Sequence, residues 1–296
     1  MKKLFVLLLA TLIIFSVGFS ADNVSVGSKN FTEEYVLSSM ISQLLEANGY
    51  DVSENFGMSS FAVRTALTTG QVDMYPEYTG TAWTSYLKKD TVIRDPIELY
   101  EEVKKLEKEE NNIIWLDRID FNNTYALAVT QEFANKHNLR TIGDLAKLVN
   151  SGDMDLVMGI DFEFYDRPDG FFAMAEEYGM EVDKRDVKTM EIGMTYEAIS
   201  RGNIQVAMVF ATDGKLNKYN LKVLADDKNF FPVYNPCVTV NGEFYAENPE
   251  IKEILAPLAK YLNANIMRRL NYLVDAGGEE PEDVAEEYLE GLGLLE

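Results

Sequence analysis

The sequence contains a single cysteine, Cys237, and a single histidine, His137, in 296 residues. One cysteine cannot form an internal disulfide, and this pair cannot supply the Cys/His ligand sets that commonly hold structural zinc. A Ser-His-Asp or Cys-His hydrolase would need this one histidine as its base. The sequence therefore predicts no metal site and disfavours such hydrolases, but it leaves open enzymes that use only carboxylates, lysines or a cofactor.

Positive charge is also scarce. The chain has 27 Lys and Arg residues against 49 Asp and Glu, which gives a formal net charge of -22 at pH 7. A chain of this charge repels phosphate backbones, so a nucleic-acid partner is not expected. The content of 47% hydrophobic and 26% charged residues is ordinary for one large globular domain or for two lobes of moderate size.

The chain has one long apolar run, at its N-terminus. Lys2 and Lys3 precede an apolar stretch over 4–17, and Gly18 and Ser20 suit the -3 and -1 positions of a signal-peptidase site. We interpret residues 1–20 as a signal peptide that is removed; the alternative is an uncleaved N-terminal anchor. No cysteine near the cleavage point is available for a lipid anchor. The mature protein is therefore expected to be exported, to the periplasm or another extracytoplasmic space.

Short apolar strands alternate with helical patterns along the chain, which is typical of layered α/β folds with parallel sheets. Thr32, followed by Glu33 and Glu34, resembles a capped helix start. The segment from Thr141 to Asp144 resembles a capping box. Further helices are predicted at 62–69, 97–109, 249–261, 264–274 and 281–292, and strands at 24–26, 72–75, 113–116, 156–160 and 187–190.

Two segments, 66–72 and 198–204, share the same order of helix end, glycine and strand start. Each is followed by an aromatic residue and a turn, at 78–80 and at 210–214. These segments suggest two similar lobes, although a helix-glycine-strand junction is common enough to recur by chance. Ligands of open α/β sheets bind beyond the carboxyl ends of strands, so both loops are expected to line one cleft.

Four segments, 27–33, 73–81, 121–127 and 226–235, closely resemble signature segments of one family. They are similar to the substrate-binding proteins of ABC importers for quaternary-ammonium osmoprotectants such as glycine betaine, choline, carnitine and proline betaine. The resemblance runs in order from about Val24 to the C-terminus. It implies an α/β, two-lobed periplasmic-binding-protein fold (type II) with two chain crossings and a ligand cleft between the lobes. Lobe one would comprise 24–122 plus 228–296, and lobe two 123–227.

A quaternary ammonium group has no N–H to donate, so aromatic faces are its natural partners. The resemblance assigns an aromatic cage to Tyr78, Tyr125, Phe210 and Tyr234; relatives usually have tyrosine at the position of Phe210. Tyr78 is preferred to Tyr75 because it precedes Thr81 by three residues. Taken singly, each of these aromatic residues could equally fill a core or cover surface.

The carboxylate of a betaine needs fixed donors. The resemblance assigns this role to Arg167, with Lys29 and Thr81 as further contributors, and it places Asn123 near the cation. The alternatives are a surface ion pair of Arg167 with Asp166 or Asp169, a solvated loop position for Lys29, and a turn or strand-edge hydrogen bond for Asn123.

The sequence as a whole is interpreted as a non-enzymatic receptor without a cofactor. It is expected to be a monomer that closes on a small quaternary-ammonium compound and delivers it to the membrane permease subunits of an ABC transporter. One alternative is the same fold with another zwitterion or amine, such as an amino acid, a thiolated betaine or a polyamine. Another is a periplasmic hydrolase or lyase that uses the carboxylates of Asp161, Glu163 and Asp169.

Overall fold

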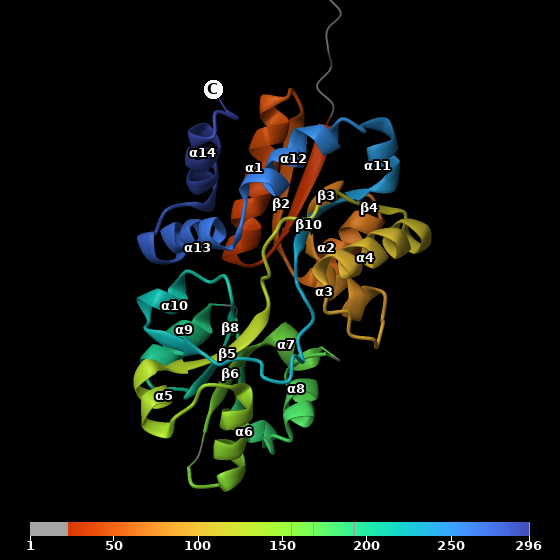
Figure 1. Cartoon of the computed structure of the whole chain (residues 1–296). Helices are drawn as coiled ribbons and strands as arrows, with labels where there is room; N and C mark the ends of the chain where they lie inside the picture. The colour runs from red at the N-terminus through yellow and green to blue at the C-terminus, as the bar shows by residue number, and fades with distance from the viewer. Residues whose placement is uncertain (1–22, 155, 168, 192, 296) are drawn as a thin grey trace, which may run out of the picture.

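Two five-stranded sheets form the frame of the computed structural model, which describes residues 23–154, 156–167, 169–191 and 193–295 (Figure 1). The first sheet has the strand order β2-β1-β3-β10-β4, and the second has the order β7-β6-β8-β5-β9. We call the layers built on these sheets the first and the second lobe. The strands of the first sheet are β1 (Asn23–Lys29), β2 (Asp51–Met58), β3 (Met74–Tyr78), β4 (Ile113–Trp115) and β10 (Pro236–Asn241). Those of the second are β5 (Tyr125–Thr130), β6 (Met158–Asp161), β7 (Val187–Met190), β8 (Val206–Phe210) and β9 (Leu221–Val223).

Both sheets are mixed rather than parallel as the sequence suggested. In the first, β1 runs parallel to β2 and β3, whereas β10 is antiparallel to β3 and β4. In the second, β6 runs parallel to β7 and β8, whereas β5 is antiparallel to β8 and β9. The antiparallel strands β5 and β10 are those that the chain enters after passing from one sheet to the other. The expected two-lobed α/β architecture is confirmed.

Helices cover both sheets. Those of the first lobe are α1 (Thr32–Ala47), α2 (Ser60–Thr68), α3 (Thr79–Thr81), a π-helical turn (Ala82–Tyr86), α4 (Pro96–Asn111), α11 (Gly242–Glu247), α12 (Ile251–Tyr261), α13 (Ala264–Tyr272), a second π-helical turn (Leu273–Gly277) and α14 (Pro281–Gly291). Those of the second lobe are α5 (Gln131–His137), α6 (Ile142–Ser151), α7 (Phe162–Asp166), α8 (Phe171–Tyr178), a 3-10 turn (Lys184–Asp186), α9 (Met194–Ser200) and α10 (Lys215–Lys218). Within the described residues, we find no helix with the length and apolar character needed to span a bilayer.

Side-chain capping explains half of the α-helix starts in the described residues. The predicted capping box is present: the Thr141 hydroxyl accepts from the backbone N–H of Asp144, and the Asp144 carboxylate accepts from that of Thr141. The predicted cap at Thr32 is wrong. The residue that precedes α1 is Phe31, and Thr32 instead donates its hydroxyl hydrogen bond to Asp275 over 2.7 Å. The first-turn acids Glu33 and Glu34 are buried rather than exposed at the helix end.

The two similar sequence segments occupy corresponding places in the two sheets. The segment 66–72 joins α2 to β3, and 198–204 joins α9 to β8. Both β3 and β8 are the central strands of their sheets. Tyr78 is the last residue of β3 and Phe210 the last residue of β8, so each central strand ends in an aromatic side chain at its carboxyl end.

Two connecting segments, 116–124 and 224–235, join the sheets, and the boundaries predicted at 122/123 and 227/228 fall within them. Hydrogen bonds tie the two connections to each other: the Asn123 N–H donates to the Tyr234 carbonyl over 3.0 Å, and the Tyr234 N–H donates to the Asn122 side chain over 2.8 Å. The connections therefore form one paired element between the lobes. The exact lobe boundaries stay a prediction.

Direct contacts also hold the lobes together away from these connections. Lys215 of the second lobe pairs with Asp275 of the first over 3.1 Å. Next to this pair, Gly214 lies against the backbone of Tyr272: a Cβ atom added to Gly214 would lie 2.4 Å from the Tyr272 Cα. A side chain of any size at position 214 is therefore incompatible with this arrangement of the lobes.

This close approach predicts how the lobes could be forced apart. Gly214 has φ -65° and ψ -29°, which alanine adopts freely, so the substitution adds only the steric conflict. We expect Gly214→Ala to separate the lobes and raise the radius of gyration in small-angle X-ray scattering, with the circular dichroism spectrum unchanged. Gly291→Ala is the control, because an added Cβ there meets no atom within 4 Å. An unchanged radius in Gly214→Ala would contradict the prediction.

Candidate ligand-binding site

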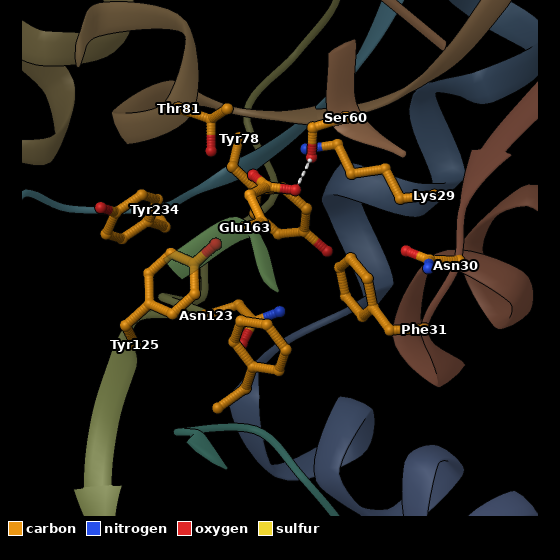
Figure 2. Close-up of a pocket in the computed structure, with 11 residues that line it drawn as sticks. Lys29, Asn30, Phe31, Ser60, Tyr78, Thr81, Asn123, Tyr125, Glu163 and Tyr234 are labelled. Carbon is orange, nitrogen blue, oxygen red and sulfur yellow. Dashed lines mark hydrogen bonds between the residues drawn. The ribbon is translucent and has the colours of Figure 1, made fainter. Parts of the chain in front are cut away.

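A small cavity of about 30 Å³ lies where the lobes meet (Figure 2). Every predicted site residue except Arg167 lines it. The lining consists of Lys29, Asn30, Phe31, Ser60, Tyr78, Thr81, Asn123, Tyr125, Glu163, Phe210 and Tyr234. The sequence interpretation did not include Asn30, Phe31, Ser60 and Glu163 in the site.

The wall of the cavity consists mainly of aromatic rings that contact one another. Phe31 stacks on Phe210 with ring centroids 5.2 Å apart, and Phe210 lies 5.1 Å from Tyr125. Tyr125 meets Tyr234 edge-on at 5.7 Å, and Phe31 lies 6.2 Å from Tyr78. Phe31 could have been found from the sequence, because it lies within the family-like segment 27–33. The rings converge from both lobes and from the second connection.

The cavity is too small for a ligand of the expected size. A volume of about 30 Å³ corresponds to about one water molecule, whereas small-molecule pockets usually span roughly 300–1,000 Å³. Phe31 and Tyr78 come from the first lobe, and Tyr125 and Phe210 from the second. A movement of the lobes would therefore separate the rings and enlarge the site.

Lys29 is buried, with 4% of its surface exposed, and is not a solvated loop residue. Its Nζ lies 2.5 Å from Glu77 Oε1 and 5.0 Å from the centroid of the Tyr78 ring. Glu77 also accepts hydrogen bonds from the hydroxyls of Tyr75 at 2.7 Å and Tyr86 at 3.0 Å. The hydroxyl of Tyr75 is thus bound to Glu77, and Tyr78 is the residue that lines the cavity. The charge of Lys29 is already neutralised by this buried carboxylate.

Arg167 does not line the cavity. Its guanidinium forms a two-pronged contact with Asp169, Nε to Oδ1 at 2.9 Å and Nη2 to Oδ2 at 2.7 Å, and its Nη1 lies 3.2 Å from Glu163. Arg167 Nη2 also donates to the hydroxyl of Thr84 in the first lobe over 3.1 Å. The ion pair with Asp169 exists, but it is buried and not on the surface, since Arg167 is 6% exposed. In this arrangement the guanidinium donors of Arg167 are bound to carboxylates of the protein itself.

Glu163 joins the two lobes at the cavity. Its Oε2 accepts a hydrogen bond from the Ser60 hydroxyl over 2.7 Å, which Figure 2 shows as a dashed line. Ser60 begins α2 in the first lobe, and Glu163 lies in α7 of the second. Thr84 makes a similar link, because its hydroxyl donates to Asp169 over 2.6 Å. These two contacts link the first lobe to the second lobe.

A buried carboxylate lies directly behind the cavity wall. Glu33 Oε1 accepts from the Tyr78 hydroxyl and from Asn123 Nδ2, each over 2.8 Å. Glu33 Oε2 accepts from Asn271 Nδ2 over 3.2 Å. Burial raises the pKa of Glu33 to about 7, against the stabilisation that these hydrogen bonds give the carboxylate. The Asn123 side chain therefore belongs to the site network rather than to a turn.

Two facing lobes with an aromatic site between them define the class of two-lobed solute-binding proteins. Residues 22–291 match the family described as the substrate binding domain of ABC-type glycine betaine transport systems, and the chain belongs to this family. The predicted resemblance is thereby confirmed. The family comprises binding proteins and not enzymes, so the alternative of a hydrolase or lyase built on Asp161, Glu163 and Asp169 is wrong.

Individual relatives agree with this assignment. The chain is 34% identical to a glycine-betaine-binding protein of Pseudomonas aeruginosa, over 96% of this chain and 92% of that protein. It is 35% identical to the ergothioneine transport permease/ergothioneine binding protein EgtU of Helicobacter pylori, over 91% of this chain but only 47% of that protein. A crystal structure of a glycine betaine/carnitine/choline ABC transporter superimposes with a TM-score of 0.73 at 32% identity, covering 94% of this chain and 100% of that one.

The buried pair of Lys29 and Glu77 predicts a large effect on stability. Glu77→Gln removes the carboxylate that forms the ion pair with the buried Lys29, and we expect a loss of about 3–5 kcal/mol in the free energy of unfolding. The measurement is chemical denaturation followed by circular dichroism. Glu197→Gln is the control, because it breaks an exposed pair with Arg201 and should cost less than about 1 kcal/mol. Equal losses in the two variants would refute the structural role of the buried pair.

Proposed function

We propose that this protein captures a small quaternary-ammonium compound between its lobes and delivers it to the permease of an ABC transporter. The observation that carries the proposal is the group of five rings, Phe31, Tyr78, Tyr125, Phe210 and Tyr234, that converge on one interlobe cavity. Because a trimethylammonium group cannot donate N–H hydrogen bonds, ring faces offer it apolar contact together with attraction to the ring quadrupole.

Closure of the lobes follows from where the rings originate. A cation held between Phe31 and Tyr78 on one side and Tyr125 and Phe210 on the other touches both lobes at once. A ligand that contacts both lobes favours the closed arrangement by its differential affinity for it. The paired connections 116–124 and 224–235 are the element about which the lobes would turn.

The names of relatives support the same class of ligand. They include glycine betaine for the Pseudomonas protein and carnitine for a Listeria monocytogenes protein. The Helicobacter relative is named both a permease and a binding protein, which supports delivery to a permease. Its named ligand, ergothioneine, is a thiolated betaine, and this supports the second candidate: the same fold with a thiolated betaine as ligand.

The location and assembly of the protein are part of the proposal. We propose an exported protein whose segment 1–20 is removed as a signal peptide; this segment lies outside the described residues. We further propose a monomer with lobe boundaries near 122/123 and 227/228. Mass spectrometry of the exported protein would locate its first residue.

The ligand class can be tested by thermal shift with glycine betaine, choline, carnitine, ergothioneine and amino acids. At 100 times its dissociation constant a true ligand adds about 2.7 kcal/mol to stability. We expect Tyr125→Ala to weaken binding of that ligand by about 0.5–2 kcal/mol and Tyr125→Phe by less, because phenylalanine keeps the ring face. Tyr219→Ala, at a ring outside the cavity, is the control. The proposal fails if no quaternary ammonium compound stabilises the parent, or if Tyr125→Ala binds as the parent does.

Arg167 offers a test of how the two ends of a betaine are recognised. To bind a carboxylate, its guanidinium would have to exchange Asp169 or Glu163 for the ligand. We expect Arg167→Ala to weaken glycine betaine by about 2–5 kcal/mol and choline by much less, because choline has no carboxylate. Calorimetry with both ligands measures the difference, and Arg185→Ala, at an exposed arginine, is the control. Equal losses would show that Arg167 supports the lobe structure instead.

A further inference from the structure

Glu33 is a buried acid that the proposed ligand contacts leave unused. It is 2% exposed, and within the described residues no lysine, arginine or histidine forms an ion pair with it. Buried carboxylates in proteins are normally paired with a cation, because an isolated buried charge is costly. Lys29, which lies on the same side of the cavity, is already bound to Glu77. A carboxylate in this setting lacks its positive partner.

The hydrogen bonds of Glu33 orient the side chains of two cavity residues, Asn123 and Tyr78. Asn123 gives its Nδ2 donor to Glu33, and its Oδ1 atom is left buried without a hydrogen-bond partner within the described residues. Because Asn123 lines the cavity, we take this unpartnered oxygen, the negative end of the amide, as a contact for a cation there. Tyr78 donates its hydroxyl hydrogen to Glu33, which increases the electron density of the ring that lines the cavity. Both effects favour a positively charged ligand.

We infer that Glu33 is a specificity-determining residue of the site, whose buried carboxylate supplies the negative charge against which a quaternary-ammonium cation is bound through Tyr78 and Asn123. The inference rests on the proposed function and deepens it, because it states why the site would take a cation rather than a neutral molecule of the same shape. Glu33 need not touch the ligand. Its carboxylate acts on the ligand through its hydrogen bonds to Tyr78 and Asn123, which line the cavity.

The same network reaches the second lobe. Asn271 donates both to Glu33 and to the Thr212 carbonyl, over 3.2 Å and 3.1 Å. Asn271 lies in α13 of the first lobe, whereas Thr212 follows β8 of the second. The Glu33 carboxylate is thus connected through Asn271 to the second lobe as well as to the cavity wall. These hydrogen bonds exist in the closed arrangement that a ligand would favour.

A consequence is that cation binding is linked to pH. Without a ligand, burial raises the pKa of Glu33 to about 7, so part of the population is protonated at neutral pH. A bound cation favours the ionised form, so the pKa falls on binding and a proton is released. Affinity for the cation should therefore rise from pH 6 to pH 8. The titratable groups that interact with Glu33 are Glu34, Tyr78 and Asp213. Lys29 and Glu77 interact with the neighbouring Glu34.

The experiment compares a cation with its uncharged carbon isostere. Choline and glycine betaine are each paired with the analogue in which a tert-butyl group replaces the trimethylammonium group. Calorimetry on the parent and on Glu33→Gln gives the preference for the cation in each protein. We expect Glu33→Gln to reduce that preference on the order of tenfold and to remove most of the rise in affinity between pH 6 and pH 8. Glu46→Gln is the control, because it removes an exposed charge at the far end of the same helix.

A rescue variant separates charge from packing. In the double variant Glu33→Gln/Asn123→Asp the carboxylate moves to position 123, and the new glutamine can donate to it in place of the original asparagine. We expect this variant to regain cation preference if charge is what matters. Equal loss of the cation and its isostere in Glu33→Gln, with no rescue, would overturn the inference and leave Glu33 a packing residue. If the parent binds neither quaternary compound, it is the proposed function that fails.

Discussion

The site depends on one geometric constraint: the carboxyl ends of the two central strands, β3 and β8, face each other across the gap between the lobes. Each strand ends in an aromatic residue, Tyr78 and Phe210. The first connection enters the second sheet at Tyr125, and the second connection returns the chain to the first sheet just after Tyr234. Because these four rings belong to strand ends and connections, the distance between the lobes sets the width of the site.

Charge is arranged around the rings with an excess of acid. Lys29 and Arg167, which lie near the cavity, both form ion pairs within the protein. Lys29 pairs with Glu77, and Arg167 pairs with Asp169 and Glu163. Glu33 remains as a buried carboxylate without an ion-pair partner in the described part of the chain. Since ions at short range in a dry interior interact strongly, this excess disfavours anions and favours a ligand that carries positive charge. The buried acid thus adds to the attraction that the ring faces themselves exert on a cation.

The sequence predicted the strands β1, β3, β4, β6 and β7, because these strands follow from local patterns, and it missed β2 and β9. The strand at 187–190 and the capping box at Thr141 are as expected. The antiparallel strands β5 and β10 were not foreseen, because their direction is decided by where the chain crosses between the sheets and not by their own residues. The cap at Thr32 was wrong for a similar reason: Asp275, which binds its hydroxyl, lies far along the chain.

The candidate site was predictable mainly where a residue belongs to a family-like segment; Phe210, which was also predicted, lies outside these segments. Seven of the eight predicted positions line the cavity, which places them at the site without testing their contact with a ligand. Ser60 and Glu163 were missed because their importance arises from a hydrogen bond between lobes, which no local pattern encodes. Arg167 was predicted to line the site, but it does not line the cavity. Its guanidinium instead pairs with the neighbouring acids Glu163 and Asp169, and these contacts could not be predicted from its own segment.

One departure from the expected family pattern lies in the wall of the cavity. Phe210 stands where the resemblance leads us to expect tyrosine. Phe210 lacks a hydroxyl and has a less electron-rich ring than tyrosine, so it weakens the attraction of the wall for a cation. Phe210 stacks on Phe31 of the opposite lobe, so apolar contact between the lobes replaces a polar group at this point. Asn123, in turn, is bound to Glu33. The negative charge of the site thus lies one layer deeper, behind Asn123 and Tyr78, where it is shielded from water and acts on the ligand through the orientation of these two side chains.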